Sequence, residues 1–145
     1  MSDAISVTFA LVIEHGREQA AADFYTAAFG AQLVKAHDDD GVLTGVDMLF
    51  GTTPISVAGA NPKREANPAL GGPFFPKEPG AVSAAIRLTV ADLDAAVSKA
   101  VAAGATIRGA AQLDDRGDRS ANLFDPFGHI WGLSERMTEA ARQAD

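Results

Sequence analysis

The sequence predicts an α+β fold made of two tandem βαβββ modules, and three observations lead to this prediction. The order strand, helix, strand, strand, strand occurs twice along the 145 residues. The segment FGAQLV (29–34) matches AGATIR (103–108), and LFGTTPISV (49–57) matches PFGHIWGLS (126–134). Because both matches keep their order and stand beside equivalent elements, they indicate an internal duplication.

The first module is expected to span residues 4–60. Its first segment is β-branched and apolar, and the next has apolar residues three and four positions apart, which is typical of an amphipathic helix. Gly30 stands where a left-handed helix C-cap belongs. The segment HDDDG (37–41) is expected to be a polar turn. The predicted elements are a strand at 5–13, a helix at 17–29, and strands at 31–36, 42–50 and 54–58.

The second module, residues 81–136, repeats this order. Asp92 is the expected N-cap of its helix, and Gly104 the expected C-cap. The linker 61–80 is rich in Pro, Gly and Asn, which punctuate rather than build regular elements, and its length is compatible with folding over a pocket. The predicted elements are strands at 82–90, 106–110, 120–124 and 129–133, a helix at 93–103, and a short final helix at 137–143.

A single domain covering residues 1–145 is expected at this length. Such a chain can bury roughly 70% of the surface that its unfolded form exposes, so it needs no disulfide or metal for stability. Each module would form a sheet with one apolar face and one covering helix. Two such sheets can pair into a cup-shaped mixed sheet with the helices on the outside, and the concave space can hold a small ligand.

Composition excludes several functions. The chain has no cysteine, which excludes disulfides, zinc thiolate sites and cysteine nucleophiles. The net charge is −7 and the 12 basic residues are scattered, so we expect no nucleic-acid partner. No apolar stretch is long enough for a membrane span, and the N-terminus lacks the pattern of a signal peptide. We therefore expect a cytoplasmic protein without a membrane partner.

Three stretches resemble the vicinal oxygen chelate superfamily of glyoxalases, bleomycin-resistance proteins and dioxygenases, in its PhnB-like or glyoxalase-like branch. They are HGREQAAADFYTAAFGA (15–31), RLTVADLDAAVSKAVAAGATI (87–107) and GDRSANLFDPFGHIWGL (117–133). The resemblance implies a cup into which four His or Glu side chains point, two from each module, on its first and last strands. In the metal enzymes of this family these side chains hold a divalent metal that acts as a Lewis acid.

In this chain none of the four expected ligand positions carries a good metal ligand. Apolar side chains occupy the first strand, serine is a poor neutral ligand, and a guanidinium stays protonated. We therefore predict no metal site and no cofactor. The residues at these positions are Leu11 or Phe9, Ser56 or Val57, Arg87, and Gly132.

The remaining histidines and Glu135 do not supply a site. His15, His37 and His129 are each expected to be solvent-exposed or satisfied within a loop or hairpin. Glu135 lies three residues beyond the ligand position of the last strand, and this odd offset places it on the opposite face. No catalytic residue is assigned.

A ligand-binding cup is the alternative to a metal site. An inward Arg87 would offer a fork for a carboxylate or phosphate, or it would pair with an acid such as Asp118. Asp47 and Ser56 would add polar contacts. Arg119 lies beside the cup in the resembling branch, or it forms a bridge with Asp118 in the turn. The apolar and stacking candidates are Phe9, Leu11, Phe74, Phe75, Phe124 and Trp131.

Two of the aromatic assignments have alternatives. Trp131 would line the cup or pack in the core of the last strand. Phe74 and Phe75 would form a lid, a hydrophobic plug or a dimer contact. The sequence thus leaves each of these side chains with either a binding or a structural role.

Three function classes fit these residues. The first is a non-catalytic binder of a small molecule, anionic or aromatic, and it demands least of the sequence. The second is a metal-dependent glyoxalase-like lyase, isomerase or dioxygenase, against which the missing ligands count. The third is a metal-free enzyme, for which Asp47 is the only acid placed near the cup. We predict the binder, and we expect a homodimer, since two-fold dimers are the commonest assemblies.

Overall fold

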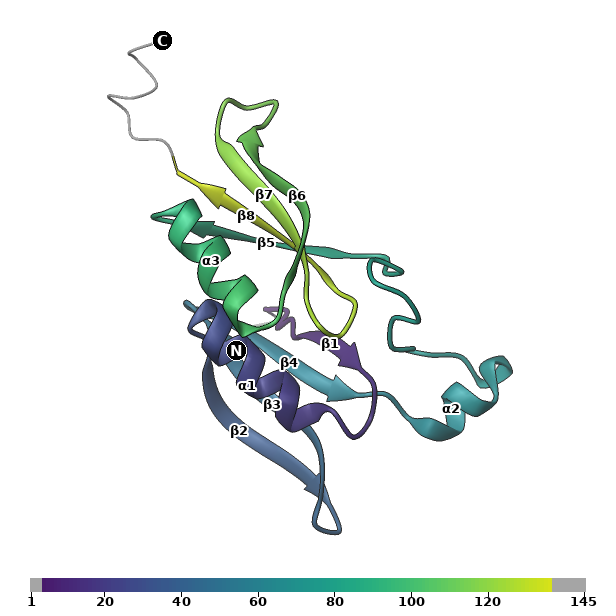
Figure 1. Cartoon of the computed structure of the whole chain (residues 1–145). Coiled ribbons are helices and arrows are strands. Elements are labelled where there is room, and N and C mark those ends of the chain that lie inside the picture. The colour runs from purple at the N-terminus through teal and green to yellow at the C-terminus, as the bar shows by residue number, and fades with distance from the viewer. Residues whose placement is uncertain (1–3, 137–145) are drawn as a thin grey trace. The chain divides into compact units, whose positions relative to one another are not determined.

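The computed structural model describes residues 4–136, and the chain divides into two compact units (Figure 1). The first unit comprises the residues up to Thr26 together with Gly30–Phe75. The second comprises Ala27–Phe29 and the described residues from Pro76 onward. The boundary between Phe75 and Pro76 lies within the linker expected from the sequence.

The first unit is a four-stranded mixed sheet with one long helix. The strand order is β1-β4-β3-β2, in which β1 runs parallel to β4 and the other neighbours are antiparallel. Its elements are β1 (Phe9–Ile13), α1 (Glu18–Phe29), β2 (Gln32–Asp39), β3 (Val42–Phe50), β4 (Thr53–Gly59), α2 (Pro62–Ala66) and the 3-10 helix η1 (Pro68–Leu70).

The second unit repeats this topology. Its strand order is β5-β8-β7-β6, with β5 parallel to β8 and the other neighbours antiparallel. Its elements are β5 (Ala85–Val90), α3 (Leu93–Ala103), β6 (Thr106–Leu113), β7 (Arg119–Phe124) and β8 (Ile130–Glu135). The prediction of an α+β fold with two tandem βαβββ modules is confirmed.

Local capping chemistry explains the helix ends. Asp92 accepts a hydrogen bond from the backbone N–H of Ala95 at 3.1 Å and so starts α3. Gly30 ends α1 in the left-handed conformation, at φ 71°, and its N–H reaches Thr26 O. Gly104 ends α3 with φ 126°. All three caps were predicted, because their signals lie within a few residues of the helix end.

Each sheet has one face against its helix and one face turned away, which we call the distal face. In the first unit the ring of Tyr25 in α1 lies 5.5 Å from that of Phe50, so the side chains of β3 that share the face of Phe50 point toward α1. In the second unit Arg119 reaches Asp94 on α3, which identifies the α3 face of β7. The alternation of strand side chains then assigns every other residue to the distal face.

The structure corrects the sequence prediction at the acidic turn and in the linker. β2 continues through His37 to Asp39, and only Asp40 and Gly41 form the turn, both with positive φ. Asp-Gly is a favoured pair for such a two-residue hairpin, so the signal was present in the sequence. The linker contains α2, because Asn61 caps the N–H of Lys63 and Pro62 suits the first helical position.

Other boundaries differ by a few residues. β1 begins at Phe9 rather than at Ile5, and β5 begins at Ala85 rather than at Val82. The helix predicted at 137–143 lies outside the described residues. Among residues 4–136, no helix is both long enough and apolar enough to span a membrane.

Candidate functional site

The distal face of the second sheet carries three rows of residues that the strand register defines. Arg87 on β5 pairs with Gly132 on β8, and Gly132 pairs with Asn122 on β7. The neighbouring row consists of Thr89, Ser134 and Ser120, and the row on the other side consists of Ala85, Ile130 and Phe124. A cationic and amide row thus lies between a hydroxyl row and an apolar row.

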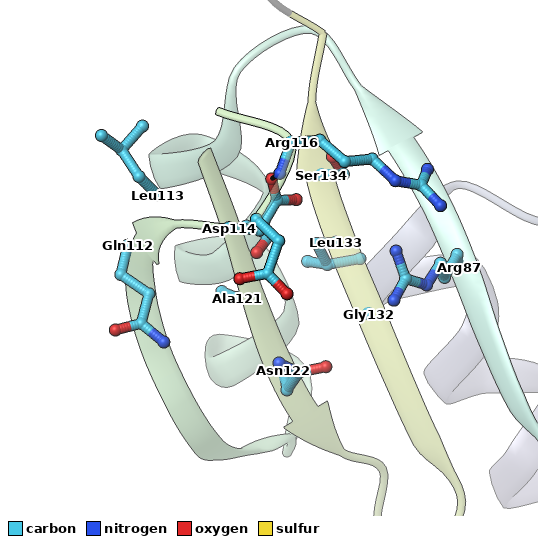
Figure 2. A pocket seen from close by; sticks show the side chains of 12 residues that line it. Arg87, Gln112, Leu113, Asp114, Arg116, Ala121, Asn122, Gly132, Leu133 and Ser134 are labelled. Atoms are coloured by element: carbon cyan, nitrogen blue, oxygen red, sulfur yellow. Dashed lines mark hydrogen bonds between the residues drawn. The ribbon is translucent and has the colours of Figure 1, made fainter. Parts of the chain in front are cut away.

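A cavity of about 410 Å³ opens on this face (Figure 2). Its floor is formed by Arg87, Gly132 and Asn122 with the hydroxyl-bearing Ser120 and Ser134 beside them. The turn between β6 and β7 forms one side. The cavity lies wholly within the second unit, and its wall is polar over β5, β8 and β7.

Arg87 supplies the cation of this cavity. The residue is exposed, and among residues 4–136 its guanidinium forms no hydrogen bond or ion pair. Figure 2 shows the group lying beside Gly132 and opposite Asp114. The alternative of an ion pair with Asp118 is therefore not found in the described part of the chain. An unpaired guanidinium in a polar cavity can bind a carboxylate or phosphate through two parallel hydrogen bonds.

Because Gly132 has no side chain, the space that Arg87 faces stays open. A Cβ atom built on Gly132 would lie 3.4 Å from Arg87 Cγ and 3.5 Å from Asn122 Oδ1. A larger side chain would enter the space between these two groups. The position where the resembling family carries a glutamate is thus a gap in the floor of the cavity.

Asp114 holds the turn at the side of the cavity. Its Oδ1 accepts hydrogen bonds from the backbone N–H groups of Arg116, at 2.9 Å, and Asp118, at 3.1 Å. These two donors offset part of the charge of Asp114 and keep the turn folded. Arg116 and Asp115 also line the cavity, so the turn brings two carboxylates and one guanidinium to the side of the cavity.

The distal face of the first sheet carries a hydrogen-bonded cluster on Asp47. Ser56 Oγ donates to Asp47 Oδ1 at 2.6 Å, and His37 Nε2 lies 2.8 Å from Asp47 Oδ2. The hydrogen bond from Ser56, and then that with His37, lowers the pKa of Asp47. A carboxylate held in this way is a weak base, which counts against a metal-free enzyme that uses Asp47.

Three predicted ligand-binding residues lie on the helix side of their sheets, which corrects their assignment. Leu11 is 3% exposed. Leu11 and Phe9 pair with the β4 residues on either side of Ser56, whose side chains point away from the distal face that carries Ser56. Trp131 is fully buried, donates from Nε1 to Asp125 Oδ2 at 2.9 Å, and packs against Phe29. Leu11 and Trp131 build the core, whereas Phe9 is 42% exposed. Trp131 therefore has the structural role of its two alternatives.

Arg119 also lies away from the cavity. Its guanidinium donates to Asp94 at 3.0 Å and to Glu135 at 3.1 Å, both on the α3 face. This pairing corrects both expectations for Arg119, which were a place beside the cup and a bridge to Asp118 within the turn. Glu135 does lie on the face opposite Gly132, as the odd offset predicted.

The remaining predicted aromatics lie near the unit boundary or on the apolar row. Phe124 lies on the distal face, where the chain at Gly80 passes close to its ring: a Cβ on Gly80 would lie 2.9 Å from Phe124 Cε1. Phe74 is exposed and Phe75 is half-buried. Neither Phe74 nor Phe75 belongs to the lining of the cavity beside Arg87.

Sequence reasoning did not find Asn122, Ser120, Ser134 or Gln112, which also line this cavity. A signal for Asn122 was available. Asp125 and His129 close the β7–β8 hairpin through their backbone, with Asp125 N donating to His129 O at 2.9 Å. Counting outward from this closure pairs Asn122 with Gly132, and so places Asn122 across Gly132 from Arg87.

Comparison with known proteins identifies the family. Residues 13–133 match the model of the Glyoxalase/Bleomycin resistance protein/Dioxygenase superfamily. The chain belongs to this superfamily. Among its relatives, an uncharacterised protein of Mycobacterium bovis is 32% identical over 120 residues, which cover 82% of this chain and 76% of the relative. An uncharacterised protein of Mycobacterium tuberculosis is likewise 32% identical, over 82% of this chain and 68% of the relative.

Solved structures share the fold of this chain. A gene product of Arabidopsis thaliana superposes with a TM-score of 0.72 at 23% identity, covering 91% of this chain and 99% of that one. The fosfomycin resistance protein FosX of Mesorhizobium loti superposes with a TM-score of 0.61 at 14% identity, over 99% of each chain. At these identities the likeness shows the fold alone.

The metal of the glyoxalase superfamily does not fit the residues present here. The register places Ala10 with Ser56 on the first distal face and Arg87 with Gly132 on the second. These positions offer a methyl group, a neutral hydroxyl, a cation and a hydrogen atom, which is not a donor set for a divalent metal. Within residues 4–136, no group of three His, Asp or Glu side chains is placed to hold a metal.

Proposed function

We propose that this protein is a small-molecule binder of the glyoxalase/bleomycin-resistance type that recognises an anionic group of its ligand through Arg87 rather than through a metal. One observation carries the proposal: an unpaired guanidinium, among the described residues, faces the gap at Gly132 in a cavity of about 410 Å³. In the metal enzymes of the family a cation sits at this face. In this chain the guanidinium of Arg87 would bind the ligand directly.

The surrounding residues support an anionic ligand. Asn122, Ser120 and Ser134 offer neutral donors beside Arg87, and such donors complete the coordination of carboxylate or phosphate oxygens. The row of Ala85, Ile130 and Phe124 adjoins them on the same face. A ligand with an anionic group and an aromatic or apolar body would match both rows.

The family branch and the assembly are also proposals. The run from Gly117 to Trp131 supports the PhnB-like or glyoxalase-like branch of the superfamily. A homodimer is supported by exposed apolar residues on the edge strands, namely Leu33 and Val34 on β2 and Ile107 and Leu113 on β6. Light scattering is expected to give twice the chain mass of 15.0 kDa, and a mass of one chain would contradict the dimer.

Calorimetric titration with matched probes tests the binding site. Benzoate carries a carboxylate on an aromatic ring, and benzamide keeps the ring without the charge. We expect benzoate to bind and benzamide to bind more weakly by about tenfold or more, since a hydrogen-bonded ion pair contributes roughly 1.5–3 kcal/mol. Inorganic phosphate serves as the anion without a ring.

Two variants make this test specific for Arg87. Arg87→Met is expected to remove the preference for benzoate over benzamide, while Arg87→Lys retains part of it because the charge remains without the fork. Arg108→Met, on β6 of the same module, is the control and is expected to bind benzoate as the wild type does. Equal binding of benzoate by Arg87→Met and wild type would contradict the proposal.

A further inference from the structure

A second cavity lies in the first unit, away from the cluster on Asp47. Its volume is about 550 Å³, and its lining includes His15, Asp39, Thr44, Asn61 and Lys63. His15 lies in the loop after β1, Thr44 on β3, and Lys63 on α2. The cavity is independent of Arg87, which belongs to the second unit.

A buried carboxylate holds the histidine of this cavity. Glu18, in the first turn of α1, is 2% exposed, and its Oε1 accepts the N–H of Gly16 at 2.7 Å. Its Oε2 contacts His15 Nδ1. Gly59 packs directly against this pair, because a Cβ built there would lie 2.0 Å from Glu18 Oε2. Only glycine at position 59 leaves room for the pair as it stands.

This contact determines which nitrogen of His15 faces a ligand. An ionised carboxylate can only accept hydrogen bonds, so the proton of a neutral imidazole belongs on Nδ1. Nε2 then presents a lone pair, and among residues 4–136 it has no hydrogen-bond partner. The His15 side chain is 35% exposed and lines the cavity. The same logic operates in catalytic triads, where a carboxylate fixes the tautomer of a histidine base.

The other charges of the cavity narrow the class of ligand. Lys63 supplies a cation on the wall, and Asn61 Oδ1 accepts the Lys63 N–H at 2.9 Å, which starts α2 at the cavity. Asp39 adds a carboxylate to the same lining. A ligand that satisfies these groups donates a hydrogen bond to His15 and carries one negative charge for Lys63. A second carboxylate on the ligand would be repelled by Asp39.

We propose that this cavity is a second binding site, for small hydroxycarboxylates with a single carboxylate group. The ligand hydroxyl donates to His15 Nε2, and the ligand carboxylate pairs with Lys63. Glu18 acts as a positioning residue, because it selects the His15 tautomer without touching the ligand. The site differs from the cavity at Arg87 in the hydroxyl that it requires of its ligand, because the lining of that cavity includes no histidine.

Nuclear magnetic resonance of the imidazole nitrogens in the full chain tests the site directly. Wild-type His15 is expected as the Nδ1–H tautomer at a pH where it is neutral. L-lactate is expected to shift the His15 resonances to saturation, whereas propionate, which lacks the hydroxyl, binds about tenfold more weakly. An Nε2–H tautomer in the wild type, or equal responses to lactate and propionate, would overturn the proposal.

Glu18→Gln gives a sharper test than removal of the histidine. Because the glutamine oxygen must still accept the Gly16 N–H, its amide group faces His15 Nδ1 and donates to it. The imidazole proton then belongs on Nε2, which can no longer accept the lactate hydroxyl. We expect inversion of the tautomer together with about tenfold weaker lactate binding. Inversion of the tautomer with unchanged lactate binding would contradict the role of Nε2.

Substitutions at exposed lysines test the site without disturbing the fold. Lys63→Met, on the surface, is expected to weaken lactate binding about tenfold while the backbone spectrum away from α2 stays unchanged. The matched control, Lys99→Met on α3, is expected to bind lactate as the wild type does. Unchanged binding in Lys63→Met would overturn the pairing with Lys63. Arg87→Met is expected to leave the lactate response intact, so failure at Arg87 and failure here are distinguishable.

Discussion

Gly132 lies opposite Arg87 in the parallel register of β5 and β8, and a Cβ on Gly132 would lie 3.4 Å from Arg87 Cγ. Gly132, which has no side chain, and a guanidinium that is unpaired among residues 4–136 therefore lie at one point of the distal face. This relationship explains how one sheet of the glyoxalase fold can present a cation without a metal. The space above Gly132 is where an anionic group would meet the guanidinium.

Gly132→Glu tests this relationship by placing a carboxylate in the space above the glycine. We expect the new side chain to pair with Arg87 and to abolish benzoate binding in calorimetry, since it occupies the site and repels the ligand. Gly132→Ala is the matched control. Its Cβ meets its neighbours at 3.4 Å or more, so benzoate binding should persist. Unchanged benzoate binding in Gly132→Glu would place the ligand elsewhere.

Trp131→Phe separates the structural role of the indole from ligand binding. The substitution removes the donor to Asp125 Oδ2 but leaves Asp125 Oδ1 with the N–H groups of Phe127 and His129. We expect the free energy of unfolding to fall by about 1–3 kcal/mol, the range for a buried polar atom that loses its partner. Urea denaturation followed by circular dichroism measures this loss, while benzoate affinity should stay within twofold, or about 0.4 kcal/mol. Loss of binding without loss of stability would restore Trp131 as a ligand contact.

The lowered pKa of Asp47 predicts a specific dependence of stability on pH. The folded pKa lies below the ordinary value of 3.8, because the carboxylate accepts from Ser56 and contacts His37. Asp47 therefore stabilises the fold above pH 3.8, and this contribution is lost as the pH falls through the lower folded pKa. Urea denaturation of the wild type and Asp47→Asn, followed from neutral pH to acid below pH 3.8, should show a difference in stability that holds above pH 3.8 and shrinks below it. A difference that stays constant over this range would contradict the assignment.

Metal analysis tests the residues at the four ligand positions of the superfamily. Protein purified without a histidine tag is expected to contain far less than one divalent metal per chain. Added Ni²⁺ or Zn²⁺ should produce no glyoxalase activity, since Arg87 and Gly132 supply no donor on the second sheet. About one tightly bound Ni, Zn, Fe or Mn per chain would contradict this expectation and favour the metal-dependent alternative.

Local signals predicted much of the fold. α3 begins at Leu93 and ends at Ala103 as expected, since Asp92 and Gly104 mark its ends within one turn. The strand Val42–Phe50 was likewise predicted at its observed bounds. The Asp40–Gly41 hairpin was missed, because three consecutive aspartates were interpreted as one polar turn rather than as a strand end followed by a two-residue loop.

The candidate site was only partly predictable, for a reason that Arg87 and Arg119 illustrate. Both are strand arginines with acids nearby in the sequence, and both were expected at the cup. Arg119 instead pairs with Asp94 and Glu135, while Arg87 stays unpaired within the described residues. Whether a strand arginine points toward the helix depends on which face of the sheet its side chain takes in the alternation along the strand. That face is set by how the strand pairs and packs with other elements, not by the residues next to the arginine in the sequence.

By itself, the sequence determined the duplicated βαβββ order, the helix caps and the lack of cysteine. These follow from short-range patterns and from residue identity, which need no three-dimensional context. Only the tertiary structure decided that Leu11 and Trp131 are core residues, and that Glu18 holds His15 at a second cavity. These facts arise from strand register and from the packing of helices on sheets, which bring together residues far apart in the chain.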